Sequence, residues 1–270
     1  MSGQTNSDAV RCRDYRLKIL EISQKVTALH AGAAFSCLEI LDCIYFRLIN
    51  KDSSGIFYDK FILSKGHGGV ALYVILEKLG IIDEETLYNY CQPEGKLGCH
   101  PDYGLPGIEA STGSLGHGLA LSVGVAYSEK YIRKSDKKVY VLISDGELQE
   151  GSTWESLMMA ANLKVSNLII FLDHNGMQSF GHTEETHPAF YPIMEKLKAF
   201  NFETYSVDGH NSEEIEKVVL ASKGNEPLFI LANTTKGKGV SFMESVPVWH
   251  YRSPSPAEYE QAKVELSKIS

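Results

Sequence analysis

Two polar turns in this sequence carry side chains suited to binding a metal ion. Asp145 follows an apolar segment at 139–143, and Asn175 follows a second apolar segment at 168–172, thirty positions later (175 − 145 = 30). If both segments are parallel strands, their ends share one edge of a sheet, where a carboxylate and an amide oxygen would meet. Such hard oxygen ligands suit Mg²⁺. Asp and Asn also cap turns, so a purely structural role for the pair stays open.

A glycine-rich segment precedes a helix that we expect at 115–131. Gly113, Gly116 and Gly118 lie at its start. Backbone N–H groups without helical partners bind anions there, and glycine lets a ligand approach closely. Close packing of the helix explains these glycines equally well. The segment therefore indicates either an anion site or a packing contact.

Seven histidines lie in segments that we expect to be loops or helix ends. Four of them are near glycine or proline: His30, His67, His100 and His250. A neutral imidazole with a pKa near ~6.5 gives and takes protons at ordinary pH. The other three crowd one loop: His174, His182 and His187. Zinc is conceivable for this trio, but no cysteine joins it and the spacing matches no known zinc pattern, so surface positions are expected for at least two of the three.

Strands and helices alternate along the chain. We expect strands at 61–64, 139–143, 168–172, 203–207 and 228–233, and helices at 9–29, 36–48, up to about Leu79, 84–90, 115–131, 152–163, 190–200, 212–222 and 255–269. The strands are near-continuous apolar runs, which is typical of a parallel sheet covered on both faces. The sequence therefore predicts an α/β fold, with a mostly parallel sheet and helices on both faces, in one domain over residues 1–270.

Composition excludes several classes of partner. The chain has 270 residues, 43% hydrophobic content and a formal net charge of −8. No Lys/Arg-rich run is present, so a nucleic-acid partner is not expected. No apolar run approaches the ~20 residues that span a bilayer, and the polar N-terminus lacks a signal-peptide core. With five cysteines and no CxxC spacing, we expect reduced thiols and a cytoplasmic location.

Several segments together resemble the transketolase family of thiamine diphosphate enzymes, in its N-terminal, diphosphate-binding half. They are "SDGELQEG…DHNGMQ", "LSKGHGG", "GCHPD", "ASTGSLGHG" and "TTKGKG…WHYR", and the resemblance covers about residues 10–255. It implies thiamine diphosphate with Mg²⁺ or Ca²⁺ as cofactors. The implied metal ligands are Asp145, Asn175 and the backbone carbonyl of Met177, and the residues implied to bind the cofactor are His67, Gly113, Ser114, Leu115, Gly146, Glu147, Asn175 and His250.

The resemblance also implies the reaction, which is transfer of a two-carbon ketol unit from a ketose to an aldose. His30, His100 and His250 would face the substrate's hydroxyl groups and shuttle protons. Glu150 would join a carboxylate pair across a subunit interface, and Glu155 would be a buried acid near that interface.

The chain departs from the family pattern at single residues and in length. Ser144 stands where the family usually has Gly, His117 replaces a common Gln, and "HAGAAF" after Leu29 replaces "HPGAPM". The family's pyrimidine-binding domain, with the glutamate that activates the aminopyrimidine, and its third domain have no counterpart here. The chain thus resembles one half of a split transketolase. A C-terminal partner subunit, a heterotetramer with two chains of each kind, and sugar or sugar-phosphate substrates are then expected.

Other functions remain open at this point. The chain could belong to a 1-deoxyxylulose-5-phosphate-synthase-like enzyme or to the α chain of a 2-oxo acid dehydrogenase E1. The four histidines near glycine or proline favour transketolase. A non-catalytic regulatory protein is an alternative of another class, and the intact pair of Asp145 and Asn175 argues against it.

Overall fold

A single parallel sheet organises the chain. The computed structural model describes residues 2–26, 29–53, 55–179 and 181–269. In this part of the chain, five strands lie side by side in the order β1 (Lys60–Leu63), β2 (Val139–Ser144), β3 (Leu168–His174), β7 (Leu228–Asn233) and β6 (Glu203–Asp208). Every neighbouring pair in this sheet is parallel. The predicted sheet is therefore confirmed.

The register of the sheet brings the ends of its central strands to one edge. Ser144 pairs with Asp173, and Asp173 pairs with Ala232. All six residues of β2 are buried, because helices cover both faces of the sheet. The chain crosses from β3 to the edge strand β6 and then returns to β7 beside β3. The boundary between β3 and β7 is thus a topological switch point, where ligands bind outside the strand ends in open α/β sheets.

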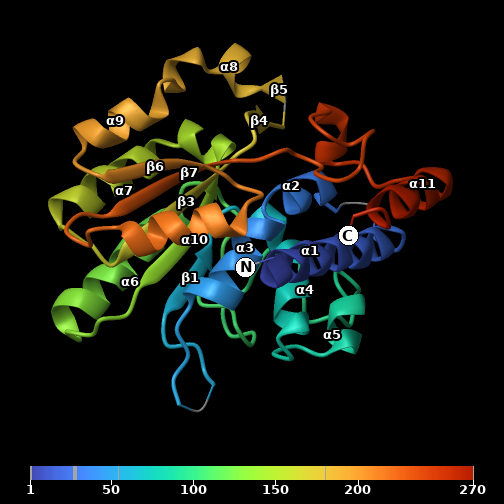
Figure 1. Cartoon of the computed structure of the whole chain (residues 1–270), viewed down its shortest axis with the longest axis horizontal. Coiled ribbons are helices and arrows are strands. Elements are labelled where there is room, and N and C mark those ends of the chain that lie inside the picture. Colours follow the sequence, from blue (N-terminus) through green and yellow to red (C-terminus); the bar gives the residue numbers. More distant parts are fainter. Residues whose placement is uncertain (1, 27–28, 54, 180, 270) are drawn as a thin grey trace.

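Helices cover both faces of the sheet (Figure 1). An apolar core lies between the sheet and the helices on each face. Alternate residues of β2 point to opposite faces, as the period of a strand requires. Val141 packs with one helical layer, made by α6 (Gly118–Tyr127), α7 (Gly151–Asn162) and α9 (Ile193–Ala199), and Tyr140 packs with the other. That second layer contains α1 (Ser2–Ser23), α3 (Leu38–Cys43), α4 (Gly69–Lys78) and α10 (Ser212–Ala221), and α11 (Pro256–Leu266) packs against α1.

Short elements complete the chain, mostly between a strand and the next long helix. The short helices are α2 (Ala31–Ser36), α5 (Glu84–Tyr88) and α8 (Thr183–Thr186), and β4 (Met177–Gln178) pairs with β5 (Gly181–His182) in a small hairpin. The 3-10 turns are η2 (Gly66–Gly68), η4 (Asp145–Gln149), η5 (Pro188–Phe190) and η6 (Pro247–His250), and η1 (Ile44–Leu48) and η3 (Ser128–Ile132) are π turns.

The predicted element boundaries differ from the observed ones at several helix ends. The helix expected at 9–29 ends at Ser23, and residues 27 and 28 lie outside the described part of the chain. The helix expected at 115–131 begins at Gly118 and continues after Tyr127 as a π turn. The small hairpin β4–β5 was not predicted, because two-residue strands leave no periodic pattern. Within the described residues, none of the helices combines the length and apolar character that crossing a bilayer requires.

Candidate active site

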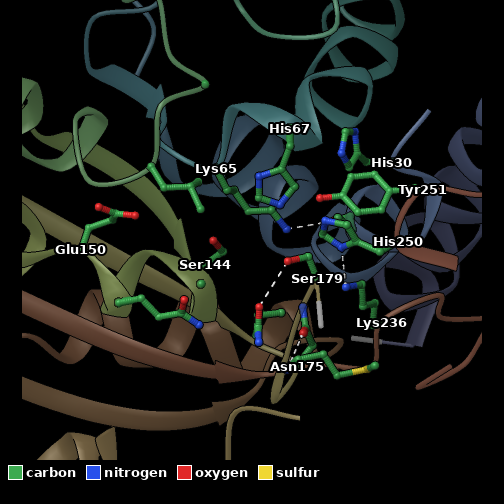
Figure 2. Close-up of a pocket in the computed structure, with 17 residues that line it drawn as sticks. His30, Lys65, His67, Ser144, Glu150, Asn175, Ser179, Lys236, His250 and Tyr251 are labelled. Carbon is green, nitrogen blue, oxygen red and sulfur yellow. Dashed lines mark hydrogen bonds between the residues drawn. The ribbon is translucent and has the colours of Figure 1, made fainter. Parts of the chain in front are cut away.

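A cavity of about 250 Å³ opens at the carboxyl edge of the sheet. The turns after β1, β2, β3 and β7 contribute to its wall, together with η6. Figure 2 shows His30, His67, His250 and Tyr251 gathered on one side and Glu150 on the opposite side. The lining residues are His30, Ala33, Lys65, His67, Gly113, Leu115, Ser144, Gly146, Gln149, Glu150, Asn175, Met177, Gln178, Ser179, Lys236, His250 and Tyr251.

Three of the four predicted histidines form one cluster. The ring centroids of His30 and His67 are 5.6 Å apart, those of His30 and His250 are 5.2 Å apart, and those of His67 and His250 are 6.0 Å apart. Tyr251 lies edge-on to His250, with centroids 4.3 Å apart. The three histidines come from the segment before α2, from η2 and from η6, so three segments distant in sequence build one imidazole cluster.

The environment of this cluster keeps the imidazoles neutral. Burial, followed by repulsion from neighbouring histidines and lysines, lowers the pKa of His30 to about 4 and that of His250 to about 3. The same causes place the pKa of His67 well below its ordinary value. A neutral imidazole carries one N–H donor and one acceptor nitrogen. The cluster can therefore both accept and donate hydrogen bonds at neutral pH.

Two buried lysines in the wall were missed by the sequence analysis. Lys65 and Lys236 are only 1% and 2% exposed. Each lies in a polar turn that follows a strand, as Asp145 does. This position was the signal in the sequence that could have identified them. Lys65 pairs with the carboxylate of Asp173 and donates to the carbonyl oxygen of Ala33 at 2.9 Å. Its charge is therefore balanced inside the protein.

Lys236 makes no ion pair with a carboxylate in the described part of the chain. Its ammonium lies 2.7 Å from Nδ1 of His250. Because an ammonium group only donates, Nδ1 of His250 accepts and the proton of this imidazole is on Nε2. Burial, and then repulsion from Lys65, lowers the pKa of Lys236 to about 8. The cavity thus holds a buried, unbalanced positive charge, which an anionic ligand would stabilise.

The predicted metal ligands lie together at the ends of β2 and β3. Asp145 is 2% exposed, and its carboxylate contacts Nδ1 of His174 at 2.6 Å and accepts from the backbone N–H of Gly176 at 2.8 Å. Oδ1 of Asn175 accepts from the N–H of Met177 at 3.1 Å. Asn175 and Met177 line the cavity, and Asp145 lies behind its wall. One carboxylate, one amide and one carbonyl oxygen match the donor set of a hard cation such as Mg²⁺.

The histidine trio of the long loop does not form a zinc site. In the described residues, no group of three or more His, Cys, Asp or Glu is arranged to hold a metal ion. His182 is exposed and His187 is half-buried. His174 instead orients Asp145. Burial lowers the pKa of His174, but the hydrogen bond to Asp145 outweighs this effect and leaves that pKa above its ordinary value.

The glycine-rich segment combines the two roles that the sequence left open. Gly113 lines the cavity, and its φ of 151° and the ring of His100, 2.9 Å from where a Cβ would lie, exclude a larger residue. Gly116 has a φ of 82°, and a Cβ there would lie 2.4 Å from the hydroxyl of Ser152. Gly116 is therefore required by packing, whereas Gly113 and Leu115 face the cavity.

Glu147 was expected to bind the cofactor, but it lies beneath the cavity wall and is fully buried. Its carboxylate accepts from the hydroxyl of Ser64 and from the N–H groups of Gly116 and Ser144, the last two at 3.1 Å. The direction of the 3-10 turn η4 places Gly146 at the surface of the cavity and Glu147 below it. Burial raises the pKa of Glu147. The side chain of Glu147 therefore links three turns: the turn after β1, the turn before α6 and the turn after β2.

The positions of four further predicted residues differ. His100 is exposed and packs on Gly113 outside the lining. Ser114 lines a neighbouring groove. Glu150 lines the cavity and is exposed. Glu155 was expected to be buried but is exposed on this chain, because it lies on the outer face of α7.

Ser144, the residue that departs from the family's glycine, lines the cavity. It is 7% exposed, and its hydroxyl has no hydrogen-bond partner among the described residues. A buried hydroxyl without a partner is costly. The hydroxyl itself is covered by neighbouring atoms, so its proton lies without an acceptor among the described residues.

We expect the neutral histidines to make stability depend on pH. In the unfolded chain each histidine titrates near ~6.5, whereas in the folded chain the pKa of His30 is about 4 and that of His250 is about 3. The unfolded state then binds more protons below pH ~6.5, so the free energy of unfolding should fall as the pH falls from ~6.5 toward ~4. His250→Gln, which removes one titrating group, should make this fall shallower in urea unfolding.

The matched control is His182→Gln, because His182 is exposed and outside the cluster. This variant should keep the pH dependence of the unmodified chain. If His250→Gln and the unmodified chain show the same pH dependence, the depressed pKa of His250 is contradicted.

Glu147→Gln tests the buried carboxylate. An amide offers one acceptor oxygen and places an NH₂ group against N–H donors, so at least one buried donor loses its partner. We expect a loss of about 1–3 kcal/mol in the free energy of unfolding, measured in urea. Glu150→Gln, at an exposed carboxylate nearby, should change it by less than about 0.5 kcal/mol. Equal effects of the two changes would show that Glu147 does not hold the turns together.

Comparison with known proteins agrees with this geometry. Residues 8–264 match the family described as transketolase, thiamine diphosphate binding domain. The chain is 40% identical to an apulose-4-phosphate transketolase subunit of Actinobacillus succinogenes, over 88% of this chain and 87% of the relative. It is 37% identical to a 6-deoxy-6-sulfo-D-fructose transketolase subunit of Clostridium sp., over 92% of each chain.

The fold is also that of a solved transketolase. The structure of transketolase from Campylobacter jejuni superposes with a TM-score of 0.87 at 28% identity, over 97% of this chain and 42% of the solved chain. The present chain therefore spans about two fifths of that longer protein. From the family match and the two relatives, we conclude that the chain belongs to the transketolase family and represents its thiamine diphosphate-binding domain.

Proposed function

We propose that this chain is the N-terminal subunit of a split, metal-dependent transketolase that transfers a two-carbon ketol unit from a ketose or its phosphate to an aldose or its phosphate. The chain acts as a single diphosphate-binding domain. The observation that carries the proposal is one cavity that combines neutral histidines, hard oxygen donors at the ends of β2 and β3, and the buried cation Lys236. Two relatives of similar length, named as transketolase subunits, support it.

The cavity fits the diphosphate end of thiamine diphosphate and its metal ion. Asp145, Asn175 and the carbonyl of Met177 would hold Mg²⁺ or Ca²⁺, which neutralises phosphate charge. Lys236 supplies a further positive charge in a site of low dielectric, where its attraction for an anion is strong. The free hydroxyl of Ser144 would donate to the same anion. Ser144, which stands where the family usually has glycine, would thus add a hydrogen bond to the anion.

The chain's own contribution to the reaction is acid–base chemistry and orientation. Thiamine diphosphate, when bound, supplies a nucleophilic carbon and an electron sink. His30, a neutral imidazole at the cavity wall, would take a proton from a substrate hydroxyl and return it. Because Lys236 donates to Nδ1 of His250, Nε2–H of that ring is the donor available to substrate. His100 would act from the rim.

A partner subunit completes the proposed enzyme. The outer face of α6 and α7 exposes large apolar side chains, including Leu121 at 46%, Met158 at 44% and Met159 at 51%. An apolar groove of about 770 Å³ on α6 includes Gly113 and Ser114, so it continues into the cavity wall. We propose that the C-terminal subunit docks here, near Glu150 and Glu155, and brings the pyrimidine pocket. Two chains of each kind would form the heterotetramer.

The rival functions differ in testable ways. A regulatory protein would not need a metal donor set or a buried cation in its cavity. The two relatives are named for different ketoses, apulose 4-phosphate and 6-deoxy-6-sulfo-D-fructose, so the sugar stays open, as does a related thiamine diphosphate reaction. A cytoplasmic location is proposed with the enzyme, since the cysteines in the described residues are free thiols.

Inorganic pyrophosphate tests the anion site on this chain alone. Titration calorimetry with magnesium pyrophosphate should show binding that strengthens with Mg²⁺. Asp145→Ala should abolish this dependence on Mg²⁺, because the metal loses its carboxylate. Lys236→Met should weaken binding about tenfold or more at every Mg²⁺ concentration, because a buried charge is lost.

Lys238→Met is the matched control, since Lys238 lies in the same turn but outside the lining. It should bind like the unmodified chain. Unchanged binding in both Asp145→Ala and Lys236→Met would place the anion site elsewhere.

The purified chain alone should show no ketol transfer. A coupled sugar-phosphate assay should give turnover only after a C-terminal transketolase subunit, Mg²⁺ and thiamine diphosphate are added. Light scattering should then report the mass of two chains of each kind. Turnover by this chain without the second subunit would contradict the split-enzyme proposal.

A further inference from the structure

Two thiols lie in contact at the two ends of a loop, and His100 directly follows this loop. Sγ of Cys91 and Sγ of Cys99 are 3.2 Å apart. A disulfide bond is about 2.05 Å long, so roughly 1.1 Å of further approach would close it. Cys12, Cys37 and Cys43, by contrast, are fully buried in the core. In the described residues, no His, Asp or Glu joins the pair in an arrangement that could hold a metal ion.

The loop between the two cysteines is already closed by its backbone. The N–H of Cys91 donates to the carbonyl oxygen of Leu97 at 2.8 Å, and the N–H of Gly95 donates to that of Gln92 at 2.9 Å. Both cysteines are only half-buried, so a small oxidant reaches them. Because folding already brings the two sulfurs together, closing the disulfide costs little further conformational entropy.

The same loop positions His100. The hydroxyl of Tyr73, a buried residue of α4, donates to the carbonyl oxygens of Gly98 at 3.2 Å and His100 at 3.0 Å. The ring of His100 packs directly on Gly113 of the cavity wall. A movement of Cys99 toward Cys91 would therefore pull on the backbone of the next residue, His100.

We propose that Cys91 and Cys99 are a reversible thiol–disulfide pair, oxidised by a hydroperoxide, and that closing the disulfide shifts His100 away from its contact with Gly113. One thiol sulfur attacks a peroxide oxygen, which forms a sulfenic acid and, with hydrogen peroxide, releases water. The second thiol then displaces the hydroxyl group as water and forms the S–S bond. Two thiols thus lose two electrons and two protons, and hydrogen peroxide becomes two waters. A dithiol reductant reverses the step.

The pairing rests on the contact between the two sulfurs, 3.2 Å apart. Burial, and then the contact with Cys99, raises the pKa of the Cys91 thiol to about 11. Because the thiolate is the attacking form, disulfide formation through Cys91 should become faster as the pH rises. Formation of the disulfide is independent of the proposed ketol transfer, and only its effect on turnover rests on that function.

The sequence itself supplies a direct assay for the bond. Lys96 lies between the two cysteines, so trypsin places Cys91 in peptide 79–96 and Cys99 in peptide 97–130. The purified chain is treated with hydrogen peroxide, alkylated and digested without reductant. Mass spectrometry should show the two peptides joined, and addition of a dithiol should separate them. Cys91→Ser and Cys99→Ser, which nearly preserve side-chain volume, should give no joined peptide.

The effect on His100 is measured without catalysis. In ¹H–¹³C NMR spectra, the ring signal of His100, assigned by its loss in His100→Gln, should shift on oxidation of the chain and return on reduction. In Cys99→Ser the signal should not respond to peroxide. With the partner subunit present, oxidation should lower turnover several-fold in the unmodified enzyme and not in Cys99→Ser.

The outcomes separate the two proposals. A joined peptide with a shifted His100 signal, in a protein that never transfers ketol units, would support the thiol pair and refute the proposed function. Alkylation of both cysteines after peroxide treatment, bonds to a core cysteine instead, or a disulfide that leaves the His100 signal unchanged would each overturn the inference.

Discussion

The buried carboxylate of Asp173 is the interaction on which the rest of the site depends. It pairs with Lys65 from the turn after β1 and accepts hydrogen bonds from Ser36 of α2 and Thr234 of the turn after β7. Burying such a charge is costly unless it is paired and hydrogen-bonded, and Asp173 meets both conditions. Despite its burial, these partners keep the pKa of Asp173 below its ordinary value. Three segments distant in sequence are thereby fixed to the end of β3.

Two of the buried carboxylates, those of Asp173 and Glu147, hold together the segments that form the cavity wall. Asp173 joins α2 and the turns after β1 and β7, and Glu147 joins the turns around β2 and the start of α6. Because Lys65 pairs with Asp173, Lys236 is left without an ion pair in the described part of the chain, beside neutral histidines. The charge of the cavity therefore favours an anion, and the histidines remain neutral. This electrostatic preorganisation is what a cofactor bound through a diphosphate requires.

The sequence predicted the sheet and much of the cavity wall, because the signals for both are local. Apolar strands followed by polar turns were enough to place Asp145 and Asn175 at adjacent strand ends. Lys65 and Lys236 could not be recognised with the same ease, since the burial of a lysine depends on packing with distant segments such as α2. The resemblance implied that Glu147 binds the cofactor, but the direction of the 3-10 turn η4 places Glu147 below the cavity and Gly146 at its wall. Glu155 lies on an outer helix face, and one chain cannot bury a residue that a partner would cover.

The central claim is that the turns after β2 and β3 hold the metal ion and the diphosphate of thiamine diphosphate. A crystal structure of the chain with its partner subunit, grown with thiamine diphosphate and Mn²⁺ in place of Mg²⁺, tests it most directly, because Mn²⁺ scatters anomalously. The account predicts one anomalous peak between the carboxylate of Asp145, the amide oxygen of Asn175 and the carbonyl of Met177, with the diphosphate beside Lys236. A cofactor bound with no peak at these residues, or a peak on other acidic side chains, would contradict it.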